Sequence, residues 1–208
     1  MPMKQGAGRR SDRFAEDTIL RASQRSGTTP LLDPAACSVV FLMPSQHDRL
    51  TQPKRSYRSY QRKTATLTSA AQIATVPTFL CCQAVEPEAV GDRDRTFTYE
   101  SHGCIWKNEA FLRALDAEDR SALVLAGYWF DLHVTAAALY ALADCYDVYI
   151  PLDASPGRSR EATRLAETRL FQAGATALLT EQIIREWAIE ISDAKRQAEL
   201  TALMDDKR

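Results

Sequence analysis

The chain has 208 residues, of which 45% are hydrophobic and 25% are charged, so it suits one ordinary domain with a real core. A formal net charge of −1 gives no general attraction to nucleic acid or to a membrane surface. No apolar run is long enough to span a bilayer, and the first residues lack the continuous apolar segment of a secretory signal. These properties exclude an integral membrane protein and disfavour a nucleic-acid partner.

Cysteine usage indicates a reducing compartment. The chain has five cysteines, an odd number, and none of them shows the C-x-x-C spacing of a metal knuckle. Cys37, Cys81 and Cys82 fall in or beside apolar runs, which suits reduced thiols that fill a core. We therefore expect a cytoplasmic protein.

Taken in chain order, the chain begins with a polar segment and then alternates strands with helices. Residues 1–33 are rich in Arg, Ser and Gly and predict a flexible tail that serves as an arm for a partner protein, with a short helix around 14–20. The predicted strands are residues 37–43, 76–82, 96–99, 121–126, 148–152 and 176–180. The predicted helices are residues 56–74, 108–115, 131–145, 160–172 and 181–190. Asn108 and Thr180 are suited to N-caps, and Gly174 is a C-terminal stop.

This alternation predicts an α/β fold. We expect a Rossmann-like three-layer α/β/α sandwich, with a mostly parallel sheet of about six strands. The domain should cover residues 34–195, with a helical C-terminal tail at 196–208. In such sheets ligands bind beyond the carboxyl ends of the strands. The site should therefore be lined by residues just after Met43, Cys82, Tyr99, Ala126 and Leu152.

Four spaced segments resemble one family. They are residues 105–111 (IWKNEAF), 126–137 (AGYWFDLHVTAA), 146–155 (YDVYIPLDAS) and 164–175 (RLAETRLFQAGA), the last followed by Leu179-Thr180. In this order they resemble the isochorismatase-like cysteine hydrolases, the superfamily that includes the nicotinamidases. The resemblance covers about residues 37–192 and is strongest after Ser121. It implies a homo-oligomer and a hydrolase fold.

The resemblance also implies a catalytic triad that this chain does not carry. Hydrolytic members use an Asp at the end of the first strand, a Lys or Arg near the third, and a nucleophilic Cys. Here the Asp position, two before Gln46, holds Pro44. A shifted alignment of the first strand would bring Asp48 nearer the site, but it would lose the match at Gln46. The basic position falls on Tyr99 or Glu100, and the Cys position holds His133. The metal-binding His/Asp cluster of nicotinamidases is not matched either.

An oxyanion site is the part of the family machinery that this sequence retains. The resemblance implies a cis peptide at Tyr128–Trp129 and oxyanion-binding amides at Trp129 and His133. Trp129, Tyr128, Gln46 and Trp106 are the candidate ligand-binding residues, although for Trp106 packing or a subunit interface is the favoured explanation. The alternative is that the turn persists only because the fold needs it.

The three histidines suggest a site with different chemistry. His47, His102 and His133 each lie near the end of a predicted strand. Together with Glu100 or Asp131 they form a candidate zinc site with an open position for water. Without metal, Glu100 is placed to orient His133 as a general base. A third candidate is a cysteine nucleophile, Cys104, activated by His102. The alternative to all three is that these are solvated loop residues.

Loss of all three triad positions favours a protein that binds or assembles rather than hydrolyses. The expected partners are further copies of the chain and a small-molecule ligand, with the tail as an arm for a partner protein. The first rival is a hydrolase with rebuilt His-based or metal-dependent chemistry on a small amide or vinyl ether. The second rival is an interaction protein that recruits a partner through the tail and a basic stretch at 49–63. That stretch is also explained as a solvated helix face.

Overall fold

A computed structural model describes residues 31–51, 54–83, 95–100 and 103–205 of the chain. The chain divides into two compact units, Met1–Pro30 and Leu31–Arg208, and the described residues belong to the second. The short helix expected at 14–20 and nearly all of the expected tail lie outside the described residues. Leu32, near the end of that predicted tail, is buried, and its N–H donates to Glu186.

Six parallel strands form one sheet, which confirms the predicted fold class. The strands are β1 (Cys37–Leu42), β2 (Thr78–Gln83), β3 (Thr96–Tyr99), β4 (Ala122–Gly127), β5 (Asp147–Pro151) and β6 (Thr176–Leu178). Their order is β3-β2-β1-β4-β5-β6, and each neighbouring pair is parallel. β1 and β4 are buried along their whole length, which explains why both read as continuous apolar runs.

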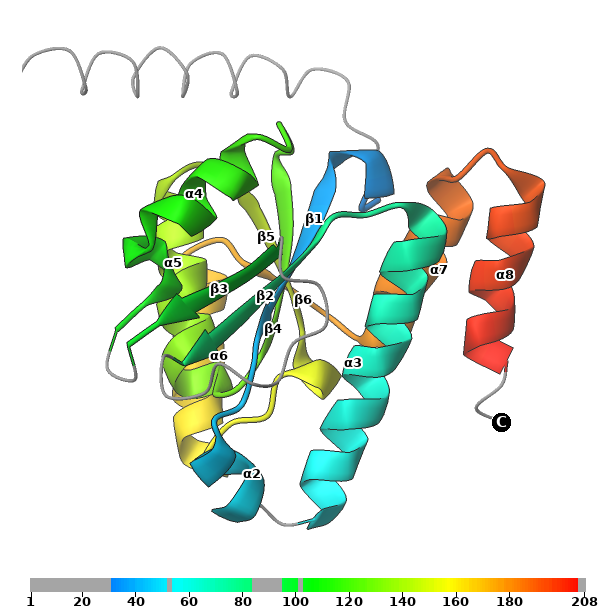
Figure 1. Cartoon of the computed structure of the whole chain (residues 1–208). Helices are drawn as coiled ribbons and strands as arrows, with labels where there is room; N and C mark the ends of the chain where they lie inside the picture. Colours follow the sequence, from blue (N-terminus) through cyan, green and yellow to red (C-terminus); the bar gives the residue numbers. More distant parts are fainter. Residues whose placement is uncertain (1–30, 52–53, 84–94, 101–102, 206–208) are drawn as a thin grey trace, which may run out of the picture. The chain divides into compact units, whose positions relative to one another are not determined.

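Helices cover both faces of the sheet (Figure 1). The elements are α2 (Gln46–Thr51), α3 (Lys54–Ala74), α4 (Glu109–Asp116), α5 (Thr135–Ala143), α6 (Arg160–Gln172), α7 (Thr180–Glu190) and α8 (Ala194–Asp205). Short turns of 3-10 helix are η2 (Pro34–Ala36), η4 (Ile105–Lys107) and η6 (Leu152–Ala154), and η5 (Phe130–Val134) is a π-helix. None of the helices in this described part combines the length and apolar character that crossing a bilayer requires.

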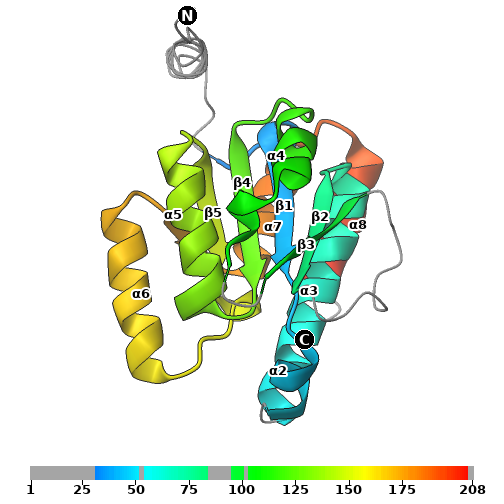
Figure 2. The same ribbon diagram turned by 60° about the vertical axis from the view of Figure 1, so that its left-hand side comes forward.

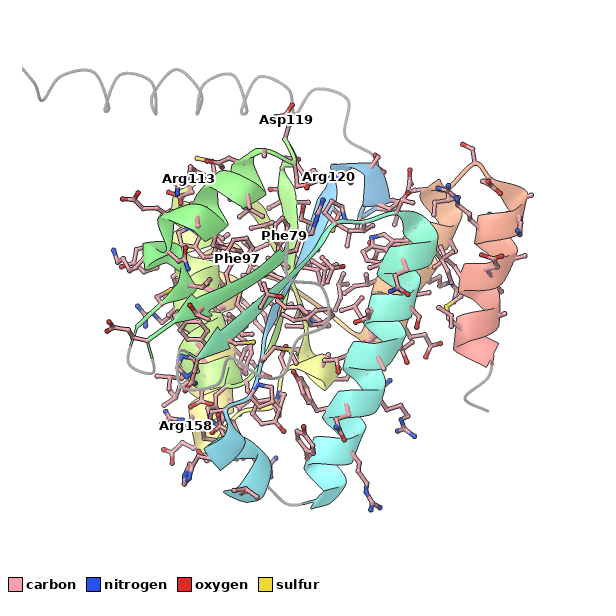
Figure 3. All side chains as sticks on the ribbon, in the orientation of Figure 1. Phe79, Phe97, Arg113, Asp119, Arg120 and Arg158 are labelled. Atoms are coloured by element: carbon pink, nitrogen blue, oxygen red, sulfur yellow. The ribbon has the colours of Figure 1, made fainter. Side chains whose placement is uncertain are left out.

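Two hydrophobic cores lie on the two faces of the sheet. Figure 2 shows the helices that cover these faces from a second side. One face packs against α4, α5 and α6 through residues such as Phe111, Ala138 and Leu170. Phe79 and Phe97 of β2 and β3 belong to this side, and their rings lie near each other (Figure 3). The other face packs against α3, α7 and α8, and it includes the fully buried Trp187. The helix expected at 196–208 therefore forms as α8 and contributes to a core.

Three predicted details were wrong. The predicted helix at 131–145 begins as the π-helix η5 and ends at Ala143. Its first turn is wide because backbone N–H groups bond five residues back, from Val134 to Trp129 at 3.1 Å and from Thr135 to Phe130. Leu179, rather than Thr180, occupies the N-cap position of α7, because Thr180 is turned toward Asp153. Helix α2 was not predicted at all.

Candidate functional site

The candidate site lies where the direction of chain connection reverses. The crossovers from β1 run outward to β2 and β3, whereas those from β4 run the other way to β5 and β6. The region beyond the carboxyl ends of the adjacent strands β1 and β4, called the crevice below, is therefore where open α/β sheets bind ligands. The residues that follow these ends are Met43 to Ser45 and Tyr128 to Phe130.

A sharp turn after β4 shapes this crevice. Gly127 has φ of +131°, and a side chain there would overlap the Leu42 backbone, so only glycine fits. The Tyr128 N–H donates to the Leu42 carbonyl at 2.9 Å, which ties the turn to the end of β1. The Tyr128–Trp129 peptide is cis, as the resemblance implied. The role of the Trp129 and His133 amides in binding an oxyanion stays a prediction.

His133 lies in η5 directly after this turn. Its side chain is only 7% exposed, and its ring packs edge-on against Tyr99, with centroids 5.5 Å apart. The Nε2 atom lies 3.1 Å from the Gln83 amide nitrogen at the end of β2. These two nitrogens form a hydrogen bond whose donor depends on the tautomer of His133. The position that the resemblance assigns to the nucleophile is thus occupied by a buried, hydrogen-bonded ring.

Tyr99 occupies one of the two possible basic positions but supplies no cation. The side chain is buried, and its hydroxyl has no hydrogen-bond partner among the described residues. Burial raises the pKa of Tyr99 above its ordinary value of 10.0, and the nearby Cys81 raises it further. Tyr99 therefore remains a neutral phenol. Glu100, at the other possible position, is exposed.

A carboxylate that the predicted site omitted lies at the crevice. Asp48 of α2 is 8% exposed, and its Oδ1 accepts the Trp129 indole N–H at 2.9 Å. Its Oδ2 accepts from the N–H and the hydroxyl of Ser45 at 3.0 and 2.7 Å, and the Ser45 Oγ accepts the Asp48 N–H at 3.2 Å. The last three bonds form a capping box, whose Ser-x-x-Asp spacing is readable in the sequence. The bond to Trp129 joins residues 81 apart in the chain and has no such signal.

Two predicted site residues serve structural roles elsewhere. Asp131 has a side chain only 2% exposed, and both of its oxygens are bound by Arg158, one to the backbone N–H and one to Nε, each at 2.8 Å. It braces the loop after β5 instead of facing His133 as a ligand or acid. The Trp106 indole donates to Asp144 at 2.8 Å. Asp144 follows the last residue of α5, whereas His133 precedes the first. Trp106 therefore packs in the core, which was one of its two predicted roles.

The remaining predicted residues do not complete a described metal site. Pro44 is buried after β1, and His47 is exposed on α2, which also contains Gln46. Among the His, Cys, Asp and Glu side chains that the structure describes, no group of three or more is arranged to hold a metal ion. His102 lies outside the described residues, so the three-histidine site and the Cys104–His102 pair stay predictions.

The thiols of Cys37, Cys81 and Cys104 are not activated. None of the five cysteines forms a disulfide, and the structure buries Cys37, Cys81 and Cys82. Burial raises the pKa of Cys37 to about 12, and it also raises the pKa values of Cys81 and Cys104. Since the thiolate is the nucleophilic form, none of these three is prepared to replace a catalytic cysteine.

Asp153 braces the segment after β5 against α3 and α7. Its Oδ1 accepts from the N–H and the hydroxyl of Thr180, each at 2.8 Å, and its Oδ2 pairs with Lys63 of α3 at 2.8 Å. Burial alone would raise the pKa of Asp153, but the hydrogen bonds from Lys63 and Thr180 outweigh it and lower that pKa. Lys63, one of the cations in the basic stretch at 49–63, is therefore bound to Asp153 within the fold.

Comparison with known proteins supports the superfamily that the motifs predict. Residues 81–182 match the isochorismatase domain. A 91-residue region is 35% identical to the probable hydrolase YcaC of Escherichia coli K12 and covers 41% of this chain. That region spans 43% of the length of the relative.

Solved structures agree on the fold. YcaC from Pseudomonas aeruginosa, crystallised with hexane-2,5-diol and covalent acrylamide, superimposes with a TM-score of 0.72 at 21% identity, over 86% of this chain and 96% of its own. The YcaC gene product of Escherichia coli, described as an octameric hydrolase of unknown specificity, gives 0.64 at 20% identity, over 88% and 100%. The MAR1 ribonuclease of Caenorhabditis elegans gives 0.67 at 19% identity, over 84% and 92%. At these identities the likeness establishes an isochorismatase-like hydrolase fold.

Proposed function

We propose that this chain is a divergent isochorismatase-fold protein that binds a small ligand or assembles with other copies, and that it does not perform cysteine hydrolysis. The observation that carries the proposal is the state of the nucleophile position. His133 stands there, 7% exposed, with Nε2 at 3.1 Å from the Gln83 amide. An imidazole held in this way supplies no thiolate, so the covalent step of cysteine hydrolases has no nucleophile at this position.

The neighbouring groups support the same conclusion. The Asp48 carboxylate accepts three hydrogen bonds, from Trp129 and Ser45, and the Asp131 carboxylate is held by Arg158. Tyr99 is a neutral phenol because burial raises its pKa. The chain's own groups thus engage both carboxylates, and no cation stands at the Tyr99 position.

Activity assays with a restored nucleophile test the proposal. The parent protein should not measurably hydrolyse nicotinamide or other small amides, with or without added zinc. His133→Cys combined with Pro44→Asp restores two of the three family residues, and any amidase activity it gains would show that the crevice still admits substrate. Zinc-dependent or zinc-free hydrolysis by the parent, lost in His133→Ala, would overturn the proposal.

Assembly into a homo-oligomer is part of the proposed function. The octamer described for the Escherichia coli protein supports it. On α5, α6 and the preceding turn, Leu132, Tyr140 and Leu165 are 43%, 40% and 57% exposed, so these elements offer apolar surface to a neighbouring subunit. Light scattering coupled to gel filtration should give a mass several times the 23.2 kDa of one chain. A monomer at micromolar concentration would contradict this part.

A cytoplasmic location is also part of the proposal. Cysteines that form no disulfides suit a reducing compartment.

A second candidate is a hydrolase with rebuilt chemistry, and Asp48 is the observation that favours it. A buried carboxylate beside Trp129 and the cis peptide stands close to where the family places its own Asp. With a water bound between them, Asp48 and His133 would act as acid and base. This candidate requires that Asp48→Asn abolish a measured activity while leaving the folded structure intact.

A further inference from the structure

A cavity of about 480 Å³ lies at the end of the sheet where the strands begin, opposite to the crevice. Its walls include the last part of α3 and the first part of β2, and Figure 1 shows α3 leading into β2 at this end of the sheet. The volume is within the range of about 300–1,000 Å³ that is usual for small-molecule sites. The described residues that supply its apolar and charged surface are Val76, Pro77, Leu80, Arg95, Glu118 and Arg120.

The register of the strands explains why this space is open. β3 pairs with β2 only from Leu80 onward, since Leu80 lies opposite Thr96. The first two residues of β2, Thr78 and Phe79, pair with β1 on one side but have no partner in β3 on the other. The cavity therefore lies beside a stretch of β2 that β3 leaves uncovered.

Two contacts hold the guanidinium of Arg95 at the cavity. Its Nη2 pairs with the Glu118 Oε1 at 2.7 Å, and its Cζ lies 5.4 Å from the centroid of the Phe79 ring. The other terminal nitrogen, Nη1, is buried and has no hydrogen-bond partner among the described residues. Buried donors in folded proteins are normally satisfied. An acceptor on a bound molecule would satisfy this one.

The charges around the cavity favour a ligand with a single negative charge. Arg95 and Arg120 are cations and Glu118 is an anion, so the described side chains that line the cavity sum to +1. Arg120 donates to three backbone carbonyls, which carry no formal charge and do not neutralise it. A carboxylate matches the planar guanidinium and balances this charge, whereas a doubly charged phosphate would leave an excess beside Glu118.

We propose that this cavity is a second ligand site, which binds small aliphatic monocarboxylates through Arg95. The carboxylate accepts a hydrogen bond from Nη1, and the aliphatic chain contacts Val76, Pro77 and Leu80. Glu118 orients the guanidinium and limits the charge of the ligand, so it determines specificity. The site is at the other end of the strands from the crevice, so it goes beyond the proposed function, and its failure would leave that proposal unaffected.

Titration of the full chain with hexanoate at neutral pH, followed through its backbone amide signals by NMR, tests the site. Hexanoate should shift the signals of Val76, Thr78 and Arg95 in a saturable way. Hexanamide has the same chain without the charge, so it should bind at least about tenfold more weakly. Signals of residues 128–130 at the crevice should not move. Equal affinity for the two probes, or shifts confined to the crevice, would overturn the proposal.

Two substitutions with opposite effects sharpen the test. Arg95→Met keeps the apolar part of the side chain but removes the donor, so hexanoate binding should weaken roughly tenfold. Glu118→Gln raises the charge of the cavity, so it should strengthen hexanoate binding several-fold and admit inorganic phosphate, which the parent should not bind. Because the second effect is a gain, a variant that merely unfolds cannot produce it.

Arg113→Met is the matched control. Arg113 is an exposed arginine that pairs with Glu109 on α4 and does not line the cavity. This variant should bind hexanoate as the parent does. Hexanoate affinity that is unchanged in folded Arg95→Met or in Glu118→Gln, or phosphate binding by the parent in preference to hexanoate, contradicts the proposed site.

Discussion

The two ends of the parallel strands are stabilised in different ways. We call the side where the strands begin the amino edge of the sheet, and the side where they finish the carboxyl edge. At the amino edge, one Arg120 nitrogen donates to the carbonyls of Pro34, Ala35 and Cys37 at 2.7, 2.8 and 3.2 Å. Figure 3 shows Arg120 at this edge and Arg158 at the other. The carboxyl edge instead carries buried hydroxyls that have no partner among the described residues.

Those hydroxyls belong to Tyr99, Tyr128 and Ser155, whereas Ser38 is their counterpart near the amino edge. A buried hydroxyl without a partner destabilises a fold unless water or a ligand satisfies it. The comparison teaches that at the amino edge one side chain satisfies several backbone carbonyls, whereas the carboxyl edge holds more of the buried hydroxyls without a partner among the described residues. The region proposed to bind a ligand lies at this carboxyl edge.

The largest effect should come from the turn at the carboxyl edge. Gly127→Ala forces a side chain into the Leu42 backbone at a φ of +131°, so it should lower the free energy of unfolding by at least about 3 kcal/mol. Gly174→Ala is the matched control, because its φ is +104° but its nearest neighbour, a Leu142 methyl, is 4.0 Å away. It should cost only about 1 kcal/mol. Urea denaturation measures both losses. If the two substitutions lowered the free energy of unfolding equally, backbone strain and not the close approach of Leu42 would explain why position 127 requires glycine.

The next effect concerns the amino edge. Arg120→Met keeps much of the side-chain volume but leaves three carbonyls without their donor, and we expect a loss of about 2 kcal/mol in the free energy of unfolding. The exchange rates of residues 127–134 at the opposite edge should not change. If they quicken as much as those of the amino edge, the two edges are not independent.

A smaller effect depends on pH. Because the pKa of Asp153 is lowered below its ordinary value of 3.8, its bonds stabilise the folded state at pH values above 3.8, and this stabilisation is lost as the pH falls through the folded-state pKa. Asp153→Asn should cost about 1 kcal/mol at pH 7, and less once the parent carboxyl is protonated. Denaturation curves at pH 7 and pH 3 measure the difference. A mutational cost that grows toward low pH would contradict this assignment.

The smallest effect should come from Tyr128→Phe. Its hydroxyl has no partner among the described residues, so removing it should change the free energy of unfolding by less than about 1 kcal/mol, or increase it. Burial raises the pKa of Tyr128 to about 12, with Tyr57 and Asp48 as smaller causes, so this hydroxyl stays protonated and able to donate. Thermal denaturation should therefore show an unchanged or higher midpoint. A loss of several kcal/mol would mean that a bound water or another group satisfies the hydroxyl.

Much of the fold was predictable because its signals are local. Continuous apolar runs predicted β1 and β4, and the capping residue Asn108 predicted the start of α4, where its side chain accepts from the amides of Ala110 and Phe111. The start of α7 was misplaced by one residue because Thr180 bonds to Asp153, 27 residues away. A long-range partner thus overrode the local preference.

The site was only partly predictable for the same reason. The turn at Gly127 and the replacement at His133 follow from motifs, but the partner of each acidic side chain does not. Asp131 was expected to face the site, yet Arg158 holds it, and Asp48 was left out although Ser45-x-x-Asp48 was readable as a capping box. Hydrogen bonds between distant segments decide which carboxylate faces the crevice, and periodicity carries no information about them.

The π-helix η5 determines what stands at position 133. A π turn holds more residues than an α turn, and each residue of an α-helix advances the side chain by about 100° around the axis. Deleting one residue from Phe130–Val134 would therefore rotate the phase of the segment relative to α5 and point the ring of His133 away from Gln83. The rotation of η5 about its own axis, as much as the identity of residue 133, therefore determines which atom lies beyond the carboxyl ends of β1 and β4.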